Sequence, residues 1–474
     1  MPPVDHECNL VEVVTQLLER VEKLERENAQ LKKAHIGPKT ERSKMPRPIS
    51  APVSPETQAA TRRANAESKR TAQSLRVEHK VPADQRTCPS CGNAQLKPVG
   101  KGRTTSVWEF VPARFVRNDH VQEVLKCPCG DYVVTAPGAP KVIEGGQYGA
   151  SVLAHLVAAK CGNHLPIYRL EKDFRRLGFP IARSTMNDLL HRASAITRPI
   201  WTRILEEIRA RPVVQADETR MRMQKDESGK PKNGFVWTFV SADESGSDVA
   251  LVFAGSRSGE TPREILDGTA GYLVVDAYSG YNRIEEVSRR RRAACHAHLR
   301  RYFHESLPTA PVAQEAIDII LDLYRIEQEA KERSLGPQDL LALRSAKAPP
   351  IRARLRAWME RQQALHPPRS PLGTAIKYGL NRWDDLGRFL EDGRIPLDNN
   401  ASERALRPIA LGRKNYLFVG DVEAGRSIAG LYTLIATCEA RGINPFAYLV
   451  DVIGRVQDHP RSRIEELLPR NWAA

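Results

Sequence analysis

The sequence lacks the long apolar segments that membrane insertion and export require. It contains no run of eighteen apolar residues, so no membrane-spanning helix is expected. The first ten residues, MPPVDHECNL, have no apolar core of the kind that secretory signals carry, so no export signal is expected either. Acidic residues are also scarce, because 57 Asp and Glu stand against 72 Lys and Arg, a formal net charge of +15. A chain this basic favours a polyanionic partner, most commonly nucleic acid.

Cysteine is sparse, and half of it falls in two close pairs. Of the eight cysteines, Cys88 and Cys91 form one pair and Cys127 and Cys129 form the other, each followed by glycine. Two pairs of thiolates can surround one tetrahedral Zn²⁺ and leave no open position. In a chain without an export signal, this spacing favours a structural zinc site. Residues 85–140 are therefore expected to form a ribbon-like zinc-binding module, with a reduced or disulfide-bonded set as the alternative.

The N-terminal region carries apolar residues at coiled-coil spacing. They recur alternately four and three residues apart at Leu10, Val14, Leu17, Val21, Leu24 and Leu31, and Asn28 is the one polar residue in that register. A lone Asn at such a position fixes the register of parallel dimers. Residues 8–33 are expected to form a coiled coil of the leucine-zipper type, and residues 10–31 to join copies into a homo-oligomer. An amphipathic helix packed on its own chain is the alternative. Residues 34–84 are expected to be a basic flexible linker.

Two helices separated by a short break are expected within residues 148–200. The pattern from Pro166 to Leu177 is helical, Gly178-Phe179-Pro180 interrupts it, and Ser184 is a good N-cap for a second helix ending near Ala195. Two short helices across a tight turn resemble a helix-turn-helix, whose second helix enters the major groove of DNA. A plain helical hairpin is the alternative. In the DNA-binding arrangement, the residues that face the bases are Arg183, Thr185, Asn187 and Asp188.

From residue 211 the pattern changes to strands, two of which end in acids. Pro212 to Thr219 is an apolar run containing Asp217, and Gly271 to Asp276 has the pattern of a buried strand. The segments between them, 235–240 and 249–253, favour an antiparallel meander, and 261–266 favours a helix. Two Asp carboxylates at the ends of neighbouring strands repel each other unless a cation lies between them. Either Asp alone is equally compatible with a turn residue.

A third acid lies in the basic stretch PLDNNASERALRPIALGRKNYLFVG, residues 396–420. Glu403 lies just inside an expected helix start, with Asn399 or Asn400 as N-cap, and the segment 416–419 is strand-like. One carboxylate among cations suits a site that holds a metal ion and a phosphate backbone. Taken alone, however, the stretch favours a structural interpretation, with an Asn400–Glu403 capping box and a Glu403–Arg407 ion pair. A strand Asp, further strands, a second Asp and a later helical acid form the order that a ribonuclease H-like core requires.

Four motifs together resemble the DDE transposases of the insertion sequence 66 family. They are Asp217-Glu-Thr219, Asp276-Ala-Tyr-Ser-Gly-Tyr281, Cys295-His-Ala-His298-Leu-Arg-Arg301 and the run from Asn399 to Asn415. The coiled coil, the cysteine module and the tail at residues 463–472 also resemble the family, so the resemblance covers nearly the whole chain. His296 departs from the family, which usually has Trp there, and Ala277 stands where Gly is common.

The resemblance implies a multidomain α+β protein with a catalytic, metal-binding triad of Asp217, Asp276 and Glu403. The triad would hold two Mg²⁺ or Mn²⁺ ions in a ribonuclease H-like core. The implied segments are a first core part at 211–304, a helical insertion at 305–395, a second core part at 396–428 and a C-terminal helical segment at 429–474.

The function implied by the resemblance is that of a bacterial DNA transposase, located in the cytoplasm with the nucleoid. Such a protein binds terminal inverted repeats and target DNA, cleaves phosphodiester bonds and transfers the freed 3′-hydroxyl. Companion proteins encoded by the same element are further expected partners. A metal-dependent nuclease without strand transfer and a non-catalytic DNA-binding protein are the alternatives.

Phosphate contact is expected at basic residues near the triad, because no acid occurs among residues 289–301. These residues are Arg289, Arg290, Arg291, Arg292, Arg300, Arg301, Arg404, Arg407, Arg413 and Lys414. His296 and His298 stay outside the catalytic set, since a structural role is equally compatible with both.

Overall fold

The computed structural model describes residues 114–126, 133–136, 141–144, 146–224, 232–243, 246–282 and 288–472, together with residues 63, 230 and 284. The chain divides into two compact units, Met1–Glu109 and Phe110–Ala474. The predicted coiled coil, the linker apart from residue 63 and the four paired cysteines lie outside the described residues. In the described part, no helix is long and apolar enough to cross a membrane.

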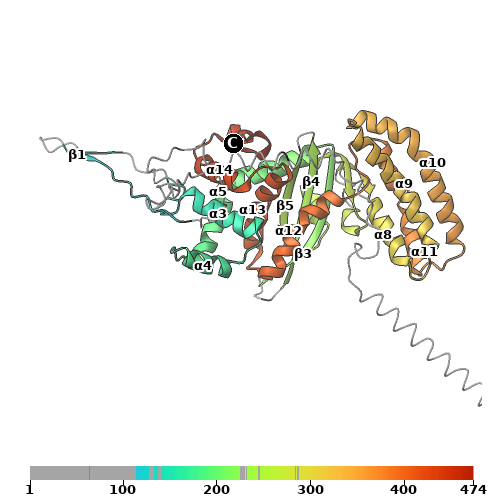
Figure 1. Cartoon of the computed structure of the whole chain (residues 1–474), viewed down its shortest axis with the longest axis horizontal. Helices are drawn as coiled ribbons and strands as arrows, with labels where there is room; N and C mark the ends of the chain where they lie inside the picture. Colours follow the sequence, from blue (N-terminus) through green and yellow to red (C-terminus); the bar gives the residue numbers. More distant parts are fainter. Residues whose placement is uncertain are drawn as a thin grey trace, which may run out of the picture. The chain divides into compact units, whose positions relative to one another are not determined.

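Six described strands of the second unit form one mixed sheet (Figure 1). They are β3 (Val213–Met223), β4 (Lys232–Asp243), β5 (Gly246–Ala254), β6 (Ala270–Val275), β7 (Arg289–Ala294) and β8 (Phe418–Val419). The order is β5-β4-β3-β6-β7, and β8 also pairs with β3. Strands β3, β4 and β5 are antiparallel neighbours, which confirms the predicted meander, whereas β6 and β7 run parallel to β3. The predicted helix before β6 is also present as α6 (Glu260–Leu266).

Strand β3 pairs with its two neighbours over different lengths, and this determines where Asp217 lies. It pairs with β4 from Gln215 to Met223, but with β6 only from Val213 to Gln215. The expectation that Asp217 ends a strand is therefore wrong, because β4 and β8 supply partners that extend β3 beyond it. Gln215 is level with Val274, so two further residues bring Asp217 level with Asp276, just beyond the end of β6. The two acids thus meet where β3 and β6 stop pairing.

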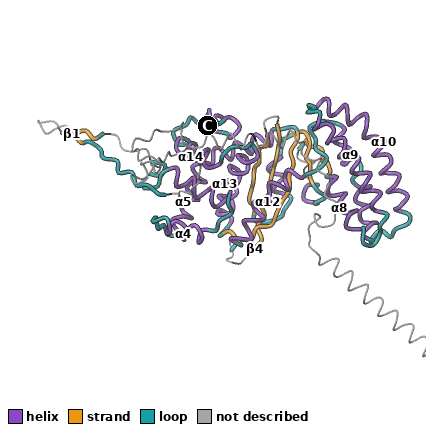
Figure 2. The backbone as a smooth tube through the Cα atoms, in the orientation of Figure 1, coloured by secondary structure: helices purple, strands orange, loops and turns teal. Residues whose placement is uncertain are grey.

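One group of helices packs against the β5 side of the sheet (Figure 2). It comprises α3 (Ala150–Val157), a π-helical turn η3 (Ala158–Gly162), α4 (Ile167–Arg176), α5 (Arg183–Ala210), α13 (Val422–Ala440) and α14 (Pro445–Arg455). Thr433 and Thr437 of α13 accept hydrogen bonds from the backbone amides of Leu251 and Val249, at 2.9 and 3.1 Å. These two side chains satisfy backbone groups of the edge strand β5, which would otherwise be open to pairing with another chain.

The predicted helix pair is present, but its second helix is longer than expected. Helix α5 has 28 residues and begins after Ala182, so the predicted N-cap at Ser184 and the predicted end near Ala195 are both wrong. The helix continues because buried apolar residues recur at helical spacing past that point, among them Ile200, Ile204 and Ile208. One face of the helix belongs to the core from Met186 onward, while Arg183 and Ser184 at its start are exposed to solvent.

A second group of helices separates β7 from the last part of the sheet. It comprises α8 (His296–Ser306), α9 (Ala313–Glu332), α10 (Pro337–Gln363), α11 (Pro371–Asn381) and a 3₁₀ turn η5 (Asp385–Leu390). These elements share an apolar core that includes Phe303, Ile320, Trp358 and Ile376. Helix α12 (Asn400–Tyr416) then returns the chain to β3.

The predicted break between the C-terminal helices is confirmed. Gly442 has a φ of +69° after α13, and Pro445 is the first residue of α14. A two-stranded antiparallel sheet, β1 (Val124–Lys126) with β2 (Val133–Thr135), flanks the segment that contains Cys127 and Cys129.

Candidate functional site

The three predicted acids come from three elements around the point where β3 and β6 diverge. Asp217 lies within β3, Asp276 follows the last residue of β6, and Glu403 lies in the first turn of α12. Burial raises the pKa of Asp217 to about 7, and the negative charges of Glu218, Asp276 and Glu403 add to this effect. Acids that are separated by 58 and 126 residues in the sequence are therefore close enough to repel one another.

Backbone amides orient two of these carboxylates. Asp217 Oδ1 accepts a hydrogen bond from the amide of Glu218 at 2.8 Å, and Asp276 Oδ1 accepts one from the amide of Tyr278 at 2.9 Å. Behind Asp276, the guanidinium of Arg292 donates to its backbone carbonyl. These bonds hold the two carboxylates in place, and each leaves further lone pairs free for a ligand.

Asn399 fastens the start of α12 to the sheet. Its fully buried side chain donates from Nδ2 to the carbonyl of Ala216 at 2.8 Å, one residue before Asp217. The backbone amide of Asn399 donates to Cys295 Sγ at 3.2 Å. The predicted capping box is wrong, because Asn400 is already the first helical residue and the cap position, Asn399, makes no side-chain bond to the helix. Asn399 instead fixes the start of α12 against β3, and so places Glu403, in the first turn of the helix, near Asp217.

Helix α8 brings two basic side chains to Glu403. Oε1 of Glu403 lies 3.7 Å from His298 Nε2 and 3.6 Å from Arg301 Nη2. The predicted Glu403–Arg407 pair is wrong, because Arg407 is exposed and forms no such ion pair among the described residues. Burial and the charge of Arg301 lower the pKa of His298, and its Nδ1 is buried without a hydrogen-bond partner among the described residues. His298 is thus a site residue that sequence reasoning left aside.

A fourth acid, Glu218, is a buried link that sequence reasoning missed. It accepts hydrogen bonds from Arg257 Nε and from the hydroxyl of Tyr281, both at 2.9 Å. Tyr281 belongs to the turn after β6, so this network ties β3 to the turn that follows Asp276. Two features of the sequence could have indicated this role. Glu218 directly follows Asp217, and Tyr281 comes five residues after Asp276.

Two of the arginines predicted to contact phosphate point into the protein instead. Arg290 is 1% exposed and donates to the carbonyls of Tyr272, Arg209 and Arg211 and to Thr269 Oγ1, at 2.7–3.1 Å. Arg292 is 5% exposed. The phosphate-contact prediction is wrong for both, because side chains of a strand alternate between its faces and every second one of the four arginines in β7 is buried.

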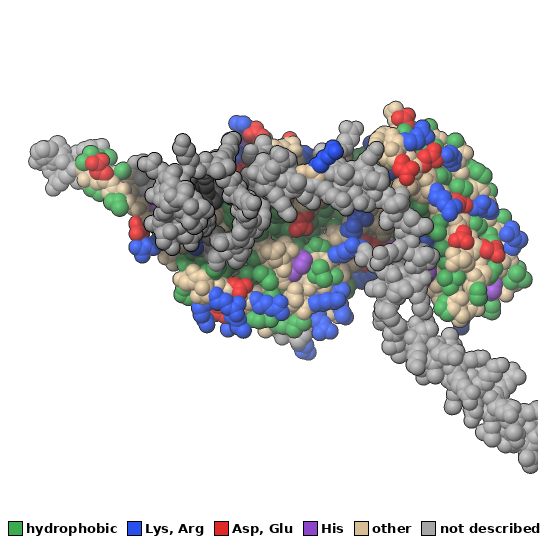
Figure 3. Space-filling view, viewed as in Figure 1, with side chains coloured by type: hydrophobic (Ala, Val, Ile, Leu, Met, Phe, Trp, Pro, Cys, Tyr) green, Lys and Arg blue, Asp and Glu red, His purple; other side chains and the backbone are tan. Residues whose placement is uncertain are grey.

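The remaining predicted basic residues differ in what they contact. Arg291 pairs with Glu391, and Arg413 donates to Thr219 Oγ1 and to the carbonyl of Arg220, at 2.8 and 2.7 Å. Arg413 therefore anchors the end of α12 to β3. Arg289, Arg291, Arg404, Arg407 and Lys414 are exposed, whereas Arg300 and Arg301 are half-buried. In Figure 3, Lys and Arg side chains gather along the lower edge of the view, over α4 and the end of α12 nearest to it.

The first two turns of α5 carry the residues predicted to face DNA bases. Arg183, Asn187 and Asp188 are exposed and Thr185 is half-buried. Arg183 Nε lies 3.1 Å from a carboxylate oxygen of Glu171 on α4. Exposure leaves these side chains accessible to a ligand, and base contact by them stays a prediction.

The acid site suits a hard divalent cation by the chemistry of its donors. All three predicted ligands are carboxylates, which Mg²⁺ and Mn²⁺ prefer. A cation would offset the burial, and the smaller repulsion from neighbouring acids, that together raise the pKa of Asp217. Among the described residues, however, no group of three or more His, Cys, Asp or Glu side chains is arranged as a ready metal site.

Three family models match successive parts of the chain. The zinc-finger binding domain of transposase IS66 matches residues 85–130, the transposase IS66 family matches residues 145–427, and the IS66 C-terminal element matches residues 433–470. The second match contains Asp217, Asp276 and Glu403.

Two curated relatives come from Sinorhizobium fredii. The uncharacterized protein y4hP is 32% identical over 409 residues, which cover 81% of this chain and 73% of that protein. The uncharacterized protein y4jD is 31% identical over 410 residues, which cover 83% of this chain and 80% of that protein. Because the transposase match alone spans more than half of the sequence, this chain belongs to the IS66 family of transposases.

Proposed function

We propose that this protein is a DDE transposase, which cuts DNA at the ends of an insertion sequence and joins them to target DNA. The observation that carries the proposal is the convergence of Asp217, Asp276 and Glu403 from three elements. The strand order β5-β4-β3-β6-β7, with three antiparallel strands followed by two parallel ones, supports a ribonuclease H-like core. Helices α9 to α11 then interrupt that core before Glu403.

The three carboxylates are the residues that would hold the metal ions. Two Mg²⁺ or Mn²⁺ ions would supply stabilisation of charge on the attacking and leaving oxygens of an in-line displacement at phosphorus. Asn399 positions Glu403 against β3, and the amide of Tyr278 orients Asp276. Arg301 and His298 add positive charge and hydrogen-bonding capacity beside Glu403, where a phosphate would lie.

DNA binding in this proposal uses exposed basic side chains on both sides of the acids. Arg404, Arg407 and Lys414 project from α12, and Arg289 projects from β7. Phosphate neutralisation by such residues positions a duplex without reading its sequence. Recognition of terminal inverted repeats is assigned to Arg183, Thr185 and Asn187 of α5. Residues 85–130 would contribute as well, with Cys88, Cys91, Cys127 and Cys129 around a structural Zn²⁺.

A strand-transfer assay tests the proposal. Purified protein, labelled terminal-repeat DNA and a plasmid target are incubated with Mg²⁺ or Mn²⁺. We expect joined product from the wild type and a loss of roughly a hundredfold or more in Glu403→Gln, because an amide cannot replace a carboxylate ligand. Glu423→Gln is the matched control, since Glu423 is an exposed acid on α13 whose only ion pair in the described structure is with Arg426.

Each outcome of that assay has a defined meaning. Equal product from wild type and Glu403→Gln would contradict the triad. Cleavage without joining, lost in Glu403→Gln, would identify a nuclease in place of a transposase. If DNA is bound but not processed, the companion proteins of the same element are added, and continued inactivity would count against the enzymatic proposal.

A further inference from the structure

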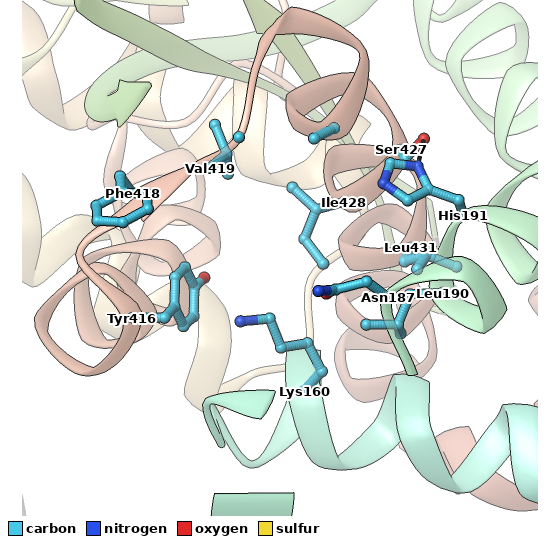
Figure 4. Close-up of a pocket in the computed structure, with 12 residues that line it drawn as sticks. Lys160, Asn187, Leu190, His191, Tyr416, Phe418, Val419, Ser427, Ile428 and Leu431 are labelled. Atoms are coloured by element: carbon cyan, nitrogen blue, oxygen red, sulfur yellow. Dashed lines mark hydrogen bonds between the residues drawn. The ribbon is translucent and has the colours of Figure 1, made fainter. Parts of the chain in front are cut away.

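A cavity of about 130 Å³ lies between η3, α5, β8 and α13, and no member of the acid triad lines it (Figure 4). The lining residues that matter here are Lys160, Asn187, His191, Tyr416, Phe418 and Ser427. Its volume accommodates several water molecules or one small polar ring. The cavity is accessible from solvent, because Asn187 is exposed and Phe418 is 46% exposed.

Lys160 places a positive charge inside this cavity. It projects from the π-helical turn η3, is 8% exposed, and its Nζ lies 3.4 Å from the centre of the Tyr416 ring. No carboxylate pairs with it in the described structure, and none of the described residues that line the cavity is acidic. Burial lowers the pKa of Lys160 to about 8. A desolvated ammonium group without an acidic partner favours the entry of an anion.

Aromatic rings form the wall next to that charge. Tyr416 ends α12, and its hydroxyl lies 2.8 Å from the hydroxyl of Tyr432, which fixes the ring. Leu417 then turns the chain with a φ of +62°, a conformation that is costly for a residue with a Cβ atom and is common at ligand sites. This turn leaves Phe418 at the rim of the cavity. Aromatic faces beside a cation are the usual platform for unpaired nucleotides.

Polar groups on the opposite wall can contact the edge of a base. Figure 4 shows Asn187 and Lys160 extending toward the same space, with His191 and Ser427 close together beside them. His191 Nδ1 and Ser427 Oγ lie 3.1 Å apart. Asn187 comes from the first turns of α5, and Tyr416 comes from the end of α12. The cavity therefore joins the two elements to which the proposed function assigns DNA contact.

We propose that this cavity receives one unpaired nucleotide of the bound DNA. The base would lie against Phe418, and an adjacent phosphate would lie at Lys160. The proposal rests on the proposed function only in taking DNA as the ligand. Glu403 and Tyr416 are thirteen residues apart on α12, which is about 20 Å along a helix axis. Successive phosphates of one strand are about 3.4 Å apart along the duplex axis. A strand that follows α12 would thus reach the cavity about six nucleotides from the acid site.

A binding experiment without Mg²⁺ or Mn²⁺ tests this proposal separately from catalysis. Two duplexes of one sequence are compared by fluorescence anisotropy, one fully paired and one with a single bulged 2-aminopurine. We expect wild type to bind the bulged duplex roughly fivefold or more tightly than the paired one, with a change in 2-aminopurine fluorescence. Phe418→Ala should lose both effects, and Lys160→Met should weaken binding of the bulged duplex.

Matched controls keep the result specific. Phe446→Ala removes a similarly exposed aromatic ring from α14, and Lys377→Met removes an exposed lysine from α11, so both should keep the preference. Phe418 is partly exposed, so its variant tests the cavity even if Lys160→Met folds poorly. Equal affinity of wild type for both duplexes, or an unchanged preference in Phe418→Ala, would overturn the proposal whether or not strand transfer is observed. Absence of strand transfer with an intact preference would count against the proposed function alone.

Discussion

Asp217 holds a proton near neutral pH because it is buried among other acids. Its pKa is about 7 in the folded protein, against 3.8 for an ordinary Asp, so the folded state binds this proton more tightly than the unfolded chain does. The resulting stabilisation is present below pH 4 and is lost as the pH rises through 7. The site is thus least stable at the pH at which its carboxylates are ready to bind a cation.

Asp217→Asn should remove this pH dependence, because an amide does not titrate. The quantity to compare is the free energy of unfolding of Asp217→Asn minus that of wild type, in the absence of divalent cations. This difference should be roughly 1–3 kcal/mol larger at pH 8 than at pH 4. Urea denaturation at a series of pH values measures the difference. Asp458→Asn changes an exposed acid and serves as the control. A difference between Asp217→Asn and wild type that is independent of pH would show that the pKa of Asp217 is not raised in the folded protein.

Neighbouring arginines of β7 should differ sharply in their contribution to stability. Arg290→Met removes four hydrogen bonds to buried acceptors and should lower the free energy of unfolding by about 2–4 kcal/mol. Arg289→Met changes an exposed side chain and should alter it by less than about 0.5 kcal/mol. Urea denaturation of the two variants makes the comparison. Similar losses would mean that β7 does not alternate as described.

At the scale of elements, the pairing of β6 with β3 decides whether the acids meet. Gly271 lies near the start of β6 with a φ of +117°, and a Cβ atom there would lie 2.1 Å from the carbonyl oxygen of Pro212. That same carbonyl accepts the amide of Tyr272 at 2.7 Å. Any side chain at Gly271 therefore pushes β6 away from β3, and Asp276 moves with it.

Gly271→Ala should accordingly destabilise the protein by about 2 kcal/mol or more and lower strand transfer. Gly268→Ala is the matched control, because its φ is +67° but a Cβ atom there meets no neighbour within 4 Å. Its cost should be near 1 kcal/mol, from the backbone conformation alone. Thermal unfolding and the strand-transfer assay measure both effects. Equal behaviour of the two variants would show that the contact with Pro212 does not matter.

At the scale of the whole molecule, the N-terminal heptads predict how copies associate. Deletion of residues 1–33 should lower the oligomeric state by light scattering, because it removes the apolar seam and Asn28. Deletion of residues 1–7 removes a similar terminus without touching the heptads and should leave the oligomeric state unchanged. If the longer deletion keeps the wild-type mass, association is carried by another part of the chain.

Much of the architecture was predictable because its signals are local. The meander, the helix before β6, the helix-rich segment between Asp276 and Glu403 and the break at Gly442 all follow from short patterns of apolar residues, glycine and proline. The three acids stand in contiguous motifs, so the resemblance could predict them without knowledge of the fold, and their catalytic role stays a prediction. The zinc ligands Cys88, Cys91, Cys127 and Cys129 remain predictions of the same kind, outside the described residues.

The sequence by itself determined the family and predicted the order of elements and the three acids, because each inference depends on residues close together along the chain. Only the tertiary structure decided that Asn399 binds β3, that Arg290 faces the core and that α5 runs on past Ala195. It also brought Lys160 to Tyr416, from a part of the chain far away in sequence. The physical reason is that burial and partner choice depend on which surfaces pack together, and packing joins residues whose separation no local pattern encodes.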